Sequence, residues 1–335
     1  MLPNRLILTD LCEVIEIHTT SKVRCRPTVF LTPILLLFML LLLIRAENAS
    51  DSVRNALSIC AKTVIPSLFP FMILSNLMVR LGTADGLGRL LAPPFRRLFG
   101  LDGACASALL LGAVSGFPVG AKSILSIYRE GGCSKEDAER TLAFCNNTGP
   151  AFVIAGIGGG FFGDMKIGVS LYIIQITAAL AVGLLMRKGQ DKKARSVHLS
   201  SSESTFTAGQ FTTSVTDAAI SVIHVCAFVI FFAVIADFIA EFTVMLGFSP
   251  LLRAGIVGFF EVTGGERMAA MSCNGVAGCI LGAAMLGWSG MSVHMQTLAL
   301  TAGSGLSVKW YFWGKLLQSI LSAVMAWGYF SVISM

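Results

Sequence analysis

Apolar runs long enough to cross a lipid bilayer recur along this sequence, and they constrain its fold more than any other feature. The first is TVFLTPILLLFMLLLLI at residues 28–44, which no charged side chain interrupts. A helix of about 20 apolar residues spans the hydrocarbon core of a bilayer. With 55% hydrophobic and 13% charged residues, the 335-residue chain has too few polar side chains to cover a soluble core of this size. We therefore predict an all-α, multi-pass integral membrane protein.

Basic residues flank the apolar runs in short clusters, as orientation signals do, and the net charge of +6 therefore predicts no nucleic-acid partner. One such cluster ends just before the first run. We expect a cytoplasmic N-terminal segment at 1–27, followed by a leading transmembrane helix at 28–44. Cleavage after Ala46 or Ala49 is the alternative, which the long N-terminal segment disfavours.

The stretch GAVSGFPVGAK at 112–122 interrupts an apolar run that extends over residues 104–128. Its glycines and proline favour a broken helix, and a lysine at bilayer depth costs roughly 2.5 to 3.5 kcal/mol on insertion scales. An unwound helix presents free N–H groups and a positive dipole end, which together with Lys122 favour an anion, most of all a carboxylate. The alternative is that Lys122 snorkels or pairs with Glu261 while the glycines only pack helices.

Residues 142–164 form a second interrupted run, which contains the sequence Asn-Asn-Thr-Gly-Pro at 146–150. If this run crossed the membrane fully, the basic loop RKGQDKKAR after the clean span at 167–186 would lie outside, against the positive-inside rule. A re-entrant hairpin with its tip at 146–150 removes the conflict. Two short full spans are the alternative.

Two connections carry signals of their own. A loop with Arg89, Arg96 and Arg97 is predicted to be cytoplasmic because it is basic. Ser134 and Asp137 have the spacing of a capping box, which predicts a short helix after them.

The second half of the chain repeats the order of the first: a long span, a glycine-interrupted span, a broken hairpin and a clean span. In the second half we expect these elements at 219–242, 252–271, 275–305 and 310–333. An odd number of crossings per half gives the copies opposite orientations, so we predict an inverted-repeat, transporter-like fold with about seven full spans plus two re-entrant or broken hairpins. The repeats are placed at 50–187 and 215–335, with a polar cytoplasmic linker at 188–214.

Candidate substrate-binding residues lie at the breaks, where a polar solute would find free main-chain groups sheltered from lipid. They are Ser115, Gly116, Pro118, Gly120, Lys122, Asn146, Asn147, Thr148, Glu261, Thr263, Gly264, Ser292 and Gln296. Glu261 is a candidate to hydrogen-bond a substrate or to carry a proton. The alternative is that it serves only as the buried partner of Lys122 or Arg267.

The sequence contains no HExxH, no GxSxG and no P-loop, and its nine cysteines include no CxxC pair. We therefore expect no enzyme activity, no metal and no cofactor, and a hydrogen-bonding role for His294. A coupling ion, Na+ or H+, is left open.

Four strings carry a family resemblance: GAVSGFPVGAKSI, AERTLAFCNNTGPAFVIAGIG, GFFEVTGG and GWSGMSVHMQ. They resemble the YlbJ family of sporulation integral membrane proteins, which belongs to the wider nucleoside-recognition, or Gate-domain, group. The resemblance extends over residues 50–333 and leaves 1–27 without a counterpart. EVTGG departs from the Glu-hydrophobic-Thr-Asn-Gly form of the family, which puts the pattern at Gly264 in doubt.

The resemblance implies a protein made during endospore formation and placed in the outer forespore membrane. It also implies that dipicolinate moves toward the spore, by alternating access, through Gate domains similar to concentrative nucleoside transporters. Dipicolinate is a small organic dianion, which suits positive charge and helix dipole ends. The alternatives are an ion-coupled nucleoside transporter and a non-transporting sporulation membrane scaffold. A homo-oligomer or other sporulation membrane proteins are the open choices of protein partner.

Overall fold

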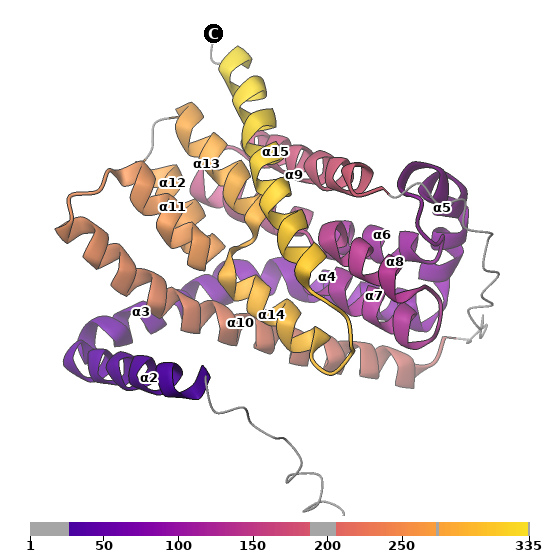
Figure 1. Cartoon of the computed structure of the whole chain (residues 1–335), viewed down its shortest axis with the longest axis horizontal. Helices are drawn as coiled ribbons and strands as arrows, with labels where there is room; N and C mark the ends of the chain where they lie inside the picture. Colours follow the sequence, from indigo (N-terminus) through magenta and orange to yellow (C-terminus); the bar gives the residue numbers. More distant parts are fainter. Residues whose placement is uncertain (1–26, 188–205, 273–274, 334–335) are drawn as a thin grey trace, which may run out of the picture. The chain divides into compact units, whose positions relative to one another are not determined.

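The computed structural model describes residues 27–187, 206–272 and 275–333, which form helices and connections without a strand (Figure 1). Contacts divide the chain into two compact units, and the boundary after Ser50 falls inside helix α3 (Ala46–Ile59). The N-terminal segment before residue 27 and the linker residues 188–205 lie outside the described residues.

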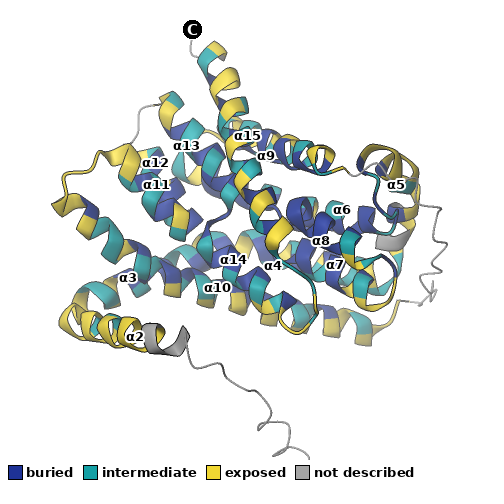
Figure 2. Ribbon diagram, viewed as in Figure 1, coloured by how far each residue is buried: buried dark blue, intermediate teal, exposed yellow. Residues whose placement is uncertain are grey.

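In the first unit, helix α2 (Pro27–Ile44) occupies the residues where the leading apolar helix is predicted. Its large apolar side chains are exposed, including Leu37 at 67% and Leu43 at 74% (Figure 2). An apolar surface of this kind suits hydrocarbon rather than water.

The long helices of the second unit are α4 (Ile65–Arg80), α9 (Met165–Leu185), α10 (Ala208–Met245) and α15 (Lys309–Ile333). A π-helical turn, η1 (Cys60–Val64), joins α3 to α4. It lies just before Pro66, which has no N–H to bond the carbonyl of Lys62.

By length and composition, four helical stretches within the described residues could cross a membrane. They are Ala46–Arg80, Met165–Leu185, Ala208–Met245 and Gly275–Thr301. The larger number of full spans expected from the sequence stays a prediction.

The prediction of a loop around Arg89, Arg96 and Arg97 is wrong, because these residues lie in the amphipathic helix α5 (Thr83–Phe99). Its buried Phe95 and Phe99 stack on Phe144 of a neighbouring helix, with ring centroids 6.4 and 5.3 Å from that ring. Burial of two aromatic rings one turn apart outweighs the cost of the Pro-Pro pair inside the helix. Arg89, Arg96 and Arg97 lie on its exposed side.

Two pairs of short helices form hairpins. In the first, α6 (Cys105–Ser115) and α7 (Val119–Arg129) pack against each other across a tip at residues 116–118. In the second, α11 (Pro250–Phe260) and α12 (Val262–Ser272) pack across Glu261 (Figure 1). A helix of 11 residues is roughly 16 Å long, so none of these four arms spans a bilayer.

Two further helices are broken along their length. Residues 146–149 are unwound between α8 (Lys135–Cys145) and the π-helix η2 (Phe152–Phe161). Ser289, with φ of 77°, separates α13 (Gly275–Trp288) from α14 (Gly290–Thr301). The side chain of Ser134 accepts the N–H of Asp137 at 3.1 Å and caps α8, as its spacing predicts.

The order of the hairpin and the broken helix in each half is therefore the reverse of the order predicted from the sequence. Residues 104–128 were expected to cross the membrane and instead fold back, whereas 142–164 belongs to a broken helix and makes no hairpin. The same exchange holds in the second half for 252–271 and 275–305. In both halves the observed order is long helix, hairpin, broken helix and long helix.

The linker prediction at 188–214 is wrong in its last part. Helix α10 begins at Ala208, where Thr207 and Gln210 form a capping box. Two reciprocal side-chain bonds satisfy main-chain N–H groups there and allow the helix to start ahead of its apolar run.

Glycines determine where the hairpin arms can fold together. A Cβ atom on Gly112 would lie 1.9 Å from the carbonyl oxygen of Cys145, and one on Gly120 would lie 2.3 Å from it. In the second hairpin, a Cβ on Gly258 or Gly265 would lie 1.9 or 2.8 Å from the sulfur of Met285. In each half, the two arms thus leave a notch that the following broken helix fills.

We expect Gly112→Ala to destabilise the protein by about 1–3 kcal/mol, because a methyl group cannot share space with the Cys145 carbonyl. Thermal unfolding of the detergent-solubilised protein measures the effect. Gly328→Ala in α15 is the matched control, since a Cβ there meets no atom within 4 Å. Equal melting midpoints for the two variants would contradict the notch.

Candidate functional site

The two hairpin tips and the two helix breaks meet in the interior of the second unit. Phe117 and Glu261 at the tips, and Phe152 and Ser292 three residues after the breaks, all line one small cavity of about 10 Å³. The tips also touch the breaks directly. A Cβ on Gly116 would lie 2.6 Å from the nitrogen of Gly149, and one on Gly290 would lie 3.0 Å from the nitrogen of Val262.

A larger cavity of about 330 Å³ reaches this meeting point from the surface. Asn55 of α3, Asp237 of α10 and Arg267 of α12 line it and are exposed. Three residues line both cavities, namely Val229, Glu261 and Thr263. The larger cavity therefore leads to the tip of the second hairpin.

Glu261 caps helix α12 with its own side chain. The buried carboxylate accepts the N–H of Thr263 at 3.0 Å and that of Gly264 at 2.6 Å. The positive dipole end of α12 is thereby occupied by a charge of the protein itself. At the other tip, the start of α7 has no side-chain cap.

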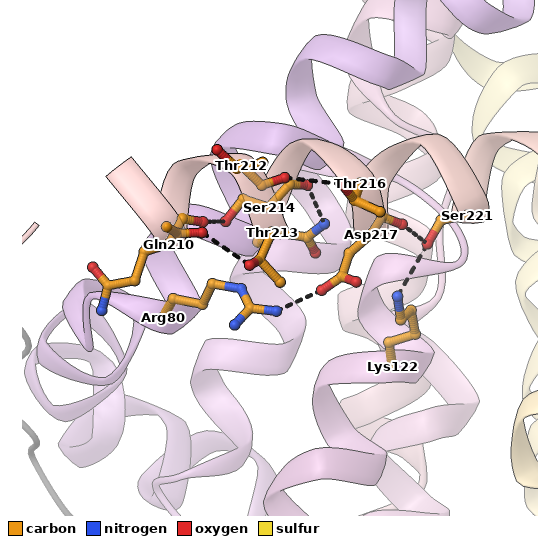
Figure 3. A network of polar contacts seen from close by, with 11 residues as sticks. Arg80, Lys122, Gln210, Thr212, Thr213, Ser214, Thr216, Asp217 and Ser221 are labelled. Carbon is orange, nitrogen blue, oxygen red and sulfur yellow. Dashed lines mark hydrogen bonds and ion pairs between the residues drawn. The ribbon is translucent and has the colours of Figure 1, made fainter. Parts of the chain in front are cut away.

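The structure sets Lys122 apart from Glu261. Lys122 is half-buried on α7, and its Nζ donates to Oγ of Ser221 on α10 at 3.0 Å (Figure 3). Ser221 donates in turn to the carbonyl of Asp217, whose carboxylate pairs with Arg80 at 2.5 Å. Lys122 lines neither cavity, and the predicted alternative of a Lys122 to Glu261 pair does not occur.

The unwound residues 146–148 are completely buried and hold three other helices together. Asn146 donates to Oγ1 of Thr297 on α14 at 3.0 Å. The main-chain carbonyl of Thr148 accepts the side-chain N–H of Gln175 on α9 at 3.1 Å. Asn147 reaches α15, where its Oδ1 accepts Nε2 of Gln318 at 2.9 Å.

A buried lysine that the sequence analysis missed lies beside Asn147. Lys315 of α15 has 0% exposure, and its Nζ donates to Oε1 of Gln318 at 3.0 Å and to Oδ1 of Asn147 at 3.4 Å. The sequence analysis predicts an uninterrupted apolar span at residues 310–333. The missed signal is a polar stripe at helical spacing inside that span: Tyr311, Lys315, Gln318 and Ser322.

Several buried polar atoms around the breaks have no hydrogen-bond partner among the described residues. They are the side-chain oxygens of Asn146, Thr148, Gln175, Ser292 and Ser322, both amide atoms of Gln296, Nε2 of His294 and both carboxyl oxygens of Glu266. More than about nine-tenths of buried polar groups are normally paired. Such a concentration indicates a place where water or a polar solute binds.

The candidate residues divide by position. Those at the meeting point or in contact with it are Ser115, Gly116, Pro118, Gly120, Asn146, Asn147, Thr148, Glu261, Thr263, Gly264 and Ser292. Gln296 is buried on α14 and lines neither cavity. The hydroxyl of Ser115 contacts that of Ser75 in α4. His294 has the expected hydrogen bond, between its Nδ1 and the hydroxyl of Tyr311 at 2.9 Å.

These features define a multi-pass helical membrane protein whose discontinuous helices meet in its interior. The model of the Gate family, described as nucleoside recognition, matches residues 61–249, and the chain belongs to this family. The chain is 28% identical over 327 residues to the sporulation integral membrane protein YlbJ of Bacillus subtilis (strain 168), covering 86% of this chain and 79% of the relative. The resemblance seen in the sequence is thus confirmed. No solved structure matches the chain.

We predict that replacing the two buried glutamates of the second hairpin has opposite effects on stability. Glu266→Met removes a carboxyl group that has no hydrogen-bond partner within the described residues, so we expect a gain of about 1–3 kcal/mol. Glu261→Met leaves two N–H groups unbonded, so we expect a loss of similar size. Thermal unfolding in detergent compares the two variants. A destabilised Glu266→Met protein would show that this carboxyl has a partner.

Proposed function

We propose that this protein moves a small organic anion across a membrane by alternating access, with dipicolinate as the first candidate. The meeting of two hairpin tips and two helix breaks beside a cavity carries the proposal. Main-chain groups are left unwound at bilayer depth only where protein or a water-filled cavity satisfies them. Discontinuous helices of this kind hold substrates and ions in many secondary transporters.

The size of the larger cavity and the helix dipole at the first hairpin tip support a small anion. The larger cavity, at about 330 Å³, lies within the range typical of small-molecule sites. The start of α7 points a positive dipole end into the meeting point without a side-chain cap, whereas Glu261 already occupies that of α12. The first hairpin tip is therefore the end at which a carboxylate would be stabilised.

The arrangement of the two halves supports an inverted repeat. Each half contains one hairpin that folds back and three elements that we propose cross the membrane, so the second copy faces the opposite way. In this proposal the N-terminus is cytoplasmic, because basic residues precede α2.

The relative in Bacillus subtilis is named for sporulation, which supports a role in spore formation. We propose the outer forespore membrane as its location, which the resemblance to the YlbJ family implies. The family description, nucleoside recognition, favours a nucleoside as the second candidate solute.

Uptake of radiolabelled dipicolinate into liposomes that hold only this protein tests the proposal. We expect protein-dependent uptake that unlabelled dipicolinate abolishes and uridine does not. Liposomes without protein are the control. Competition by uridine alone would favour nucleoside transport. Uptake of neither solute by folded protein would favour a scaffold.

Gln296→Leu separates a binding role from a structural one. Both amide atoms of Gln296 are buried and have no partner in the described parts of the chain, so its loss should not lower the melting midpoint. If the amide binds solute, uptake falls about tenfold, the effect of one lost hydrogen bond to a charged group. Met295→Leu in the same helix is the control and should leave uptake unchanged. Unchanged uptake by Gln296→Leu would remove this residue from the site.

A further inference from the structure

We infer that Lys315 binds a carboxylate of the transported anion, with Asn147 and Gln318 holding its ammonium group in place. This inference rests on the proposed function and names the part of the site that recognises negative charge. It assigns that role to a buried residue of α15 in place of Lys122.

The charge of Lys315 has no counter-ion within the described residues. The side chain is fully buried, and it takes part in none of the ion pairs formed there. A buried charge costs several kcal/mol unless an opposite charge or strong hydrogen bonds offset it. An ionisable residue inside a membrane protein therefore indicates a functional partner.

The neutral partners of Lys315 do not use all of its donors. An ammonium group has three N–H donors, and Lys315 has two acceptors, one of them as far away as 3.4 Å. The more distant acceptor, Oδ1 of Asn147, already receives a shorter bond from Gln318 at 2.9 Å. At least one donor of Lys315 is thus free for a ligand.

Two further hydroxyl groups neighbour this network in the sequence. Thr148 follows directly after Asn147, and Ser322 lies one turn after Gln318 on α15; both hydroxyls are buried and have no hydrogen-bond partner among the described residues. A carboxylate accepts several hydrogen bonds at once and supplies the missing negative charge. One such group would satisfy the remaining donor of the ammonium group.

Lys122 differs from Lys315 in its burial and in the side chains that it contacts. It is half-buried, bonds the hydroxyl of Ser221, and belongs to a network that contains the carboxylate of Asp217 (Figure 3). The charge that most needs an external anion is therefore that of Lys315.

Binding by the purified full-length protein in detergent tests this role. The probes are dipicolinate and its neutral diamide, pyridine-2,6-dicarboxamide, and the readout is the ligand-dependent shift in melting midpoint. We expect the native protein to prefer dipicolinate and Lys315→Met to bind it about tenfold to a hundredfold more weakly, with the preference over the diamide lost. Lys309→Met, an exposed lysine at the start of the same helix, is the matched control and should bind as the native protein does.

Two variants keep the test decisive if Lys315→Met does not fold. Lys315→Gln retains hydrogen bonds to its neighbours without the charge and should lose the preference for dipicolinate. Lys315→Arg retains the charge and should keep part of that preference. Equal affinity of Lys315→Gln and the native protein for dipicolinate overturns the inference.

Liposome uptake separates this inference from the proposed function. If the native protein transports dipicolinate and Lys315→Gln transports it equally well, the proposed function stands and the role of Lys315 fails. If dipicolinate stabilises the native protein through Lys315 but is not taken up, the carboxylate site stands and transport fails. If dipicolinate does not shift the native melting midpoint, the carboxylate site is overturned.

Discussion

Main-chain hydrogen bonding inside lipid is the constraint on which this structure depends. An unwound peptide at bilayer depth costs several kcal/mol for each unpaired group, so a single broken helix could not face hydrocarbon. Here the breaks protect one another, because each hairpin tip lies against a break, and residues at both tips and just after both breaks line one cavity. Glycines at the notches let the arms come close enough for this arrangement. The interior that results contains many buried polar side chains among its apolar ones.

The buried charges show how that interior is organised. Glu261 is satisfied by the N–H groups at the start of its own helix, which makes it a structural cap as well as a wall of the larger cavity. Lys315 and Glu266 are equally buried and have no ion-pair partner among the described residues. A structure selected for stability alone would gain from apolar side chains at these positions. Their presence is the strongest physical support for a transport role.

Local signals in the sequence located the breaks but not their shapes. The turn residues around Pro118 and Asn147 placed both breaks of the first half, and Ser134 marked the start of a helix correctly. The choice between hairpin and broken helix depended on whether the arms pack on each other, which Gly112 and Gly120 decide through contact with the distant Cys145. Helix α5 was missed because its stability comes from Phe95 and Phe99 stacking on Phe144, a contact outside its own segment.

The sequence by itself determined the membrane class, the positions of the discontinuities and the family. These follow from hydropathy, turn chemistry and local motifs, which act over a few residues. Only the tertiary structure decided which polar residues meet. It turned Lys122 toward Ser221 and brought Lys315 to Asn147 across 168 positions of sequence. It also left Gln296 without a partner among the residues that the structure describes. Such pairings depend on how helices pack, and packing joins residues whose separation along the chain carries no local signal.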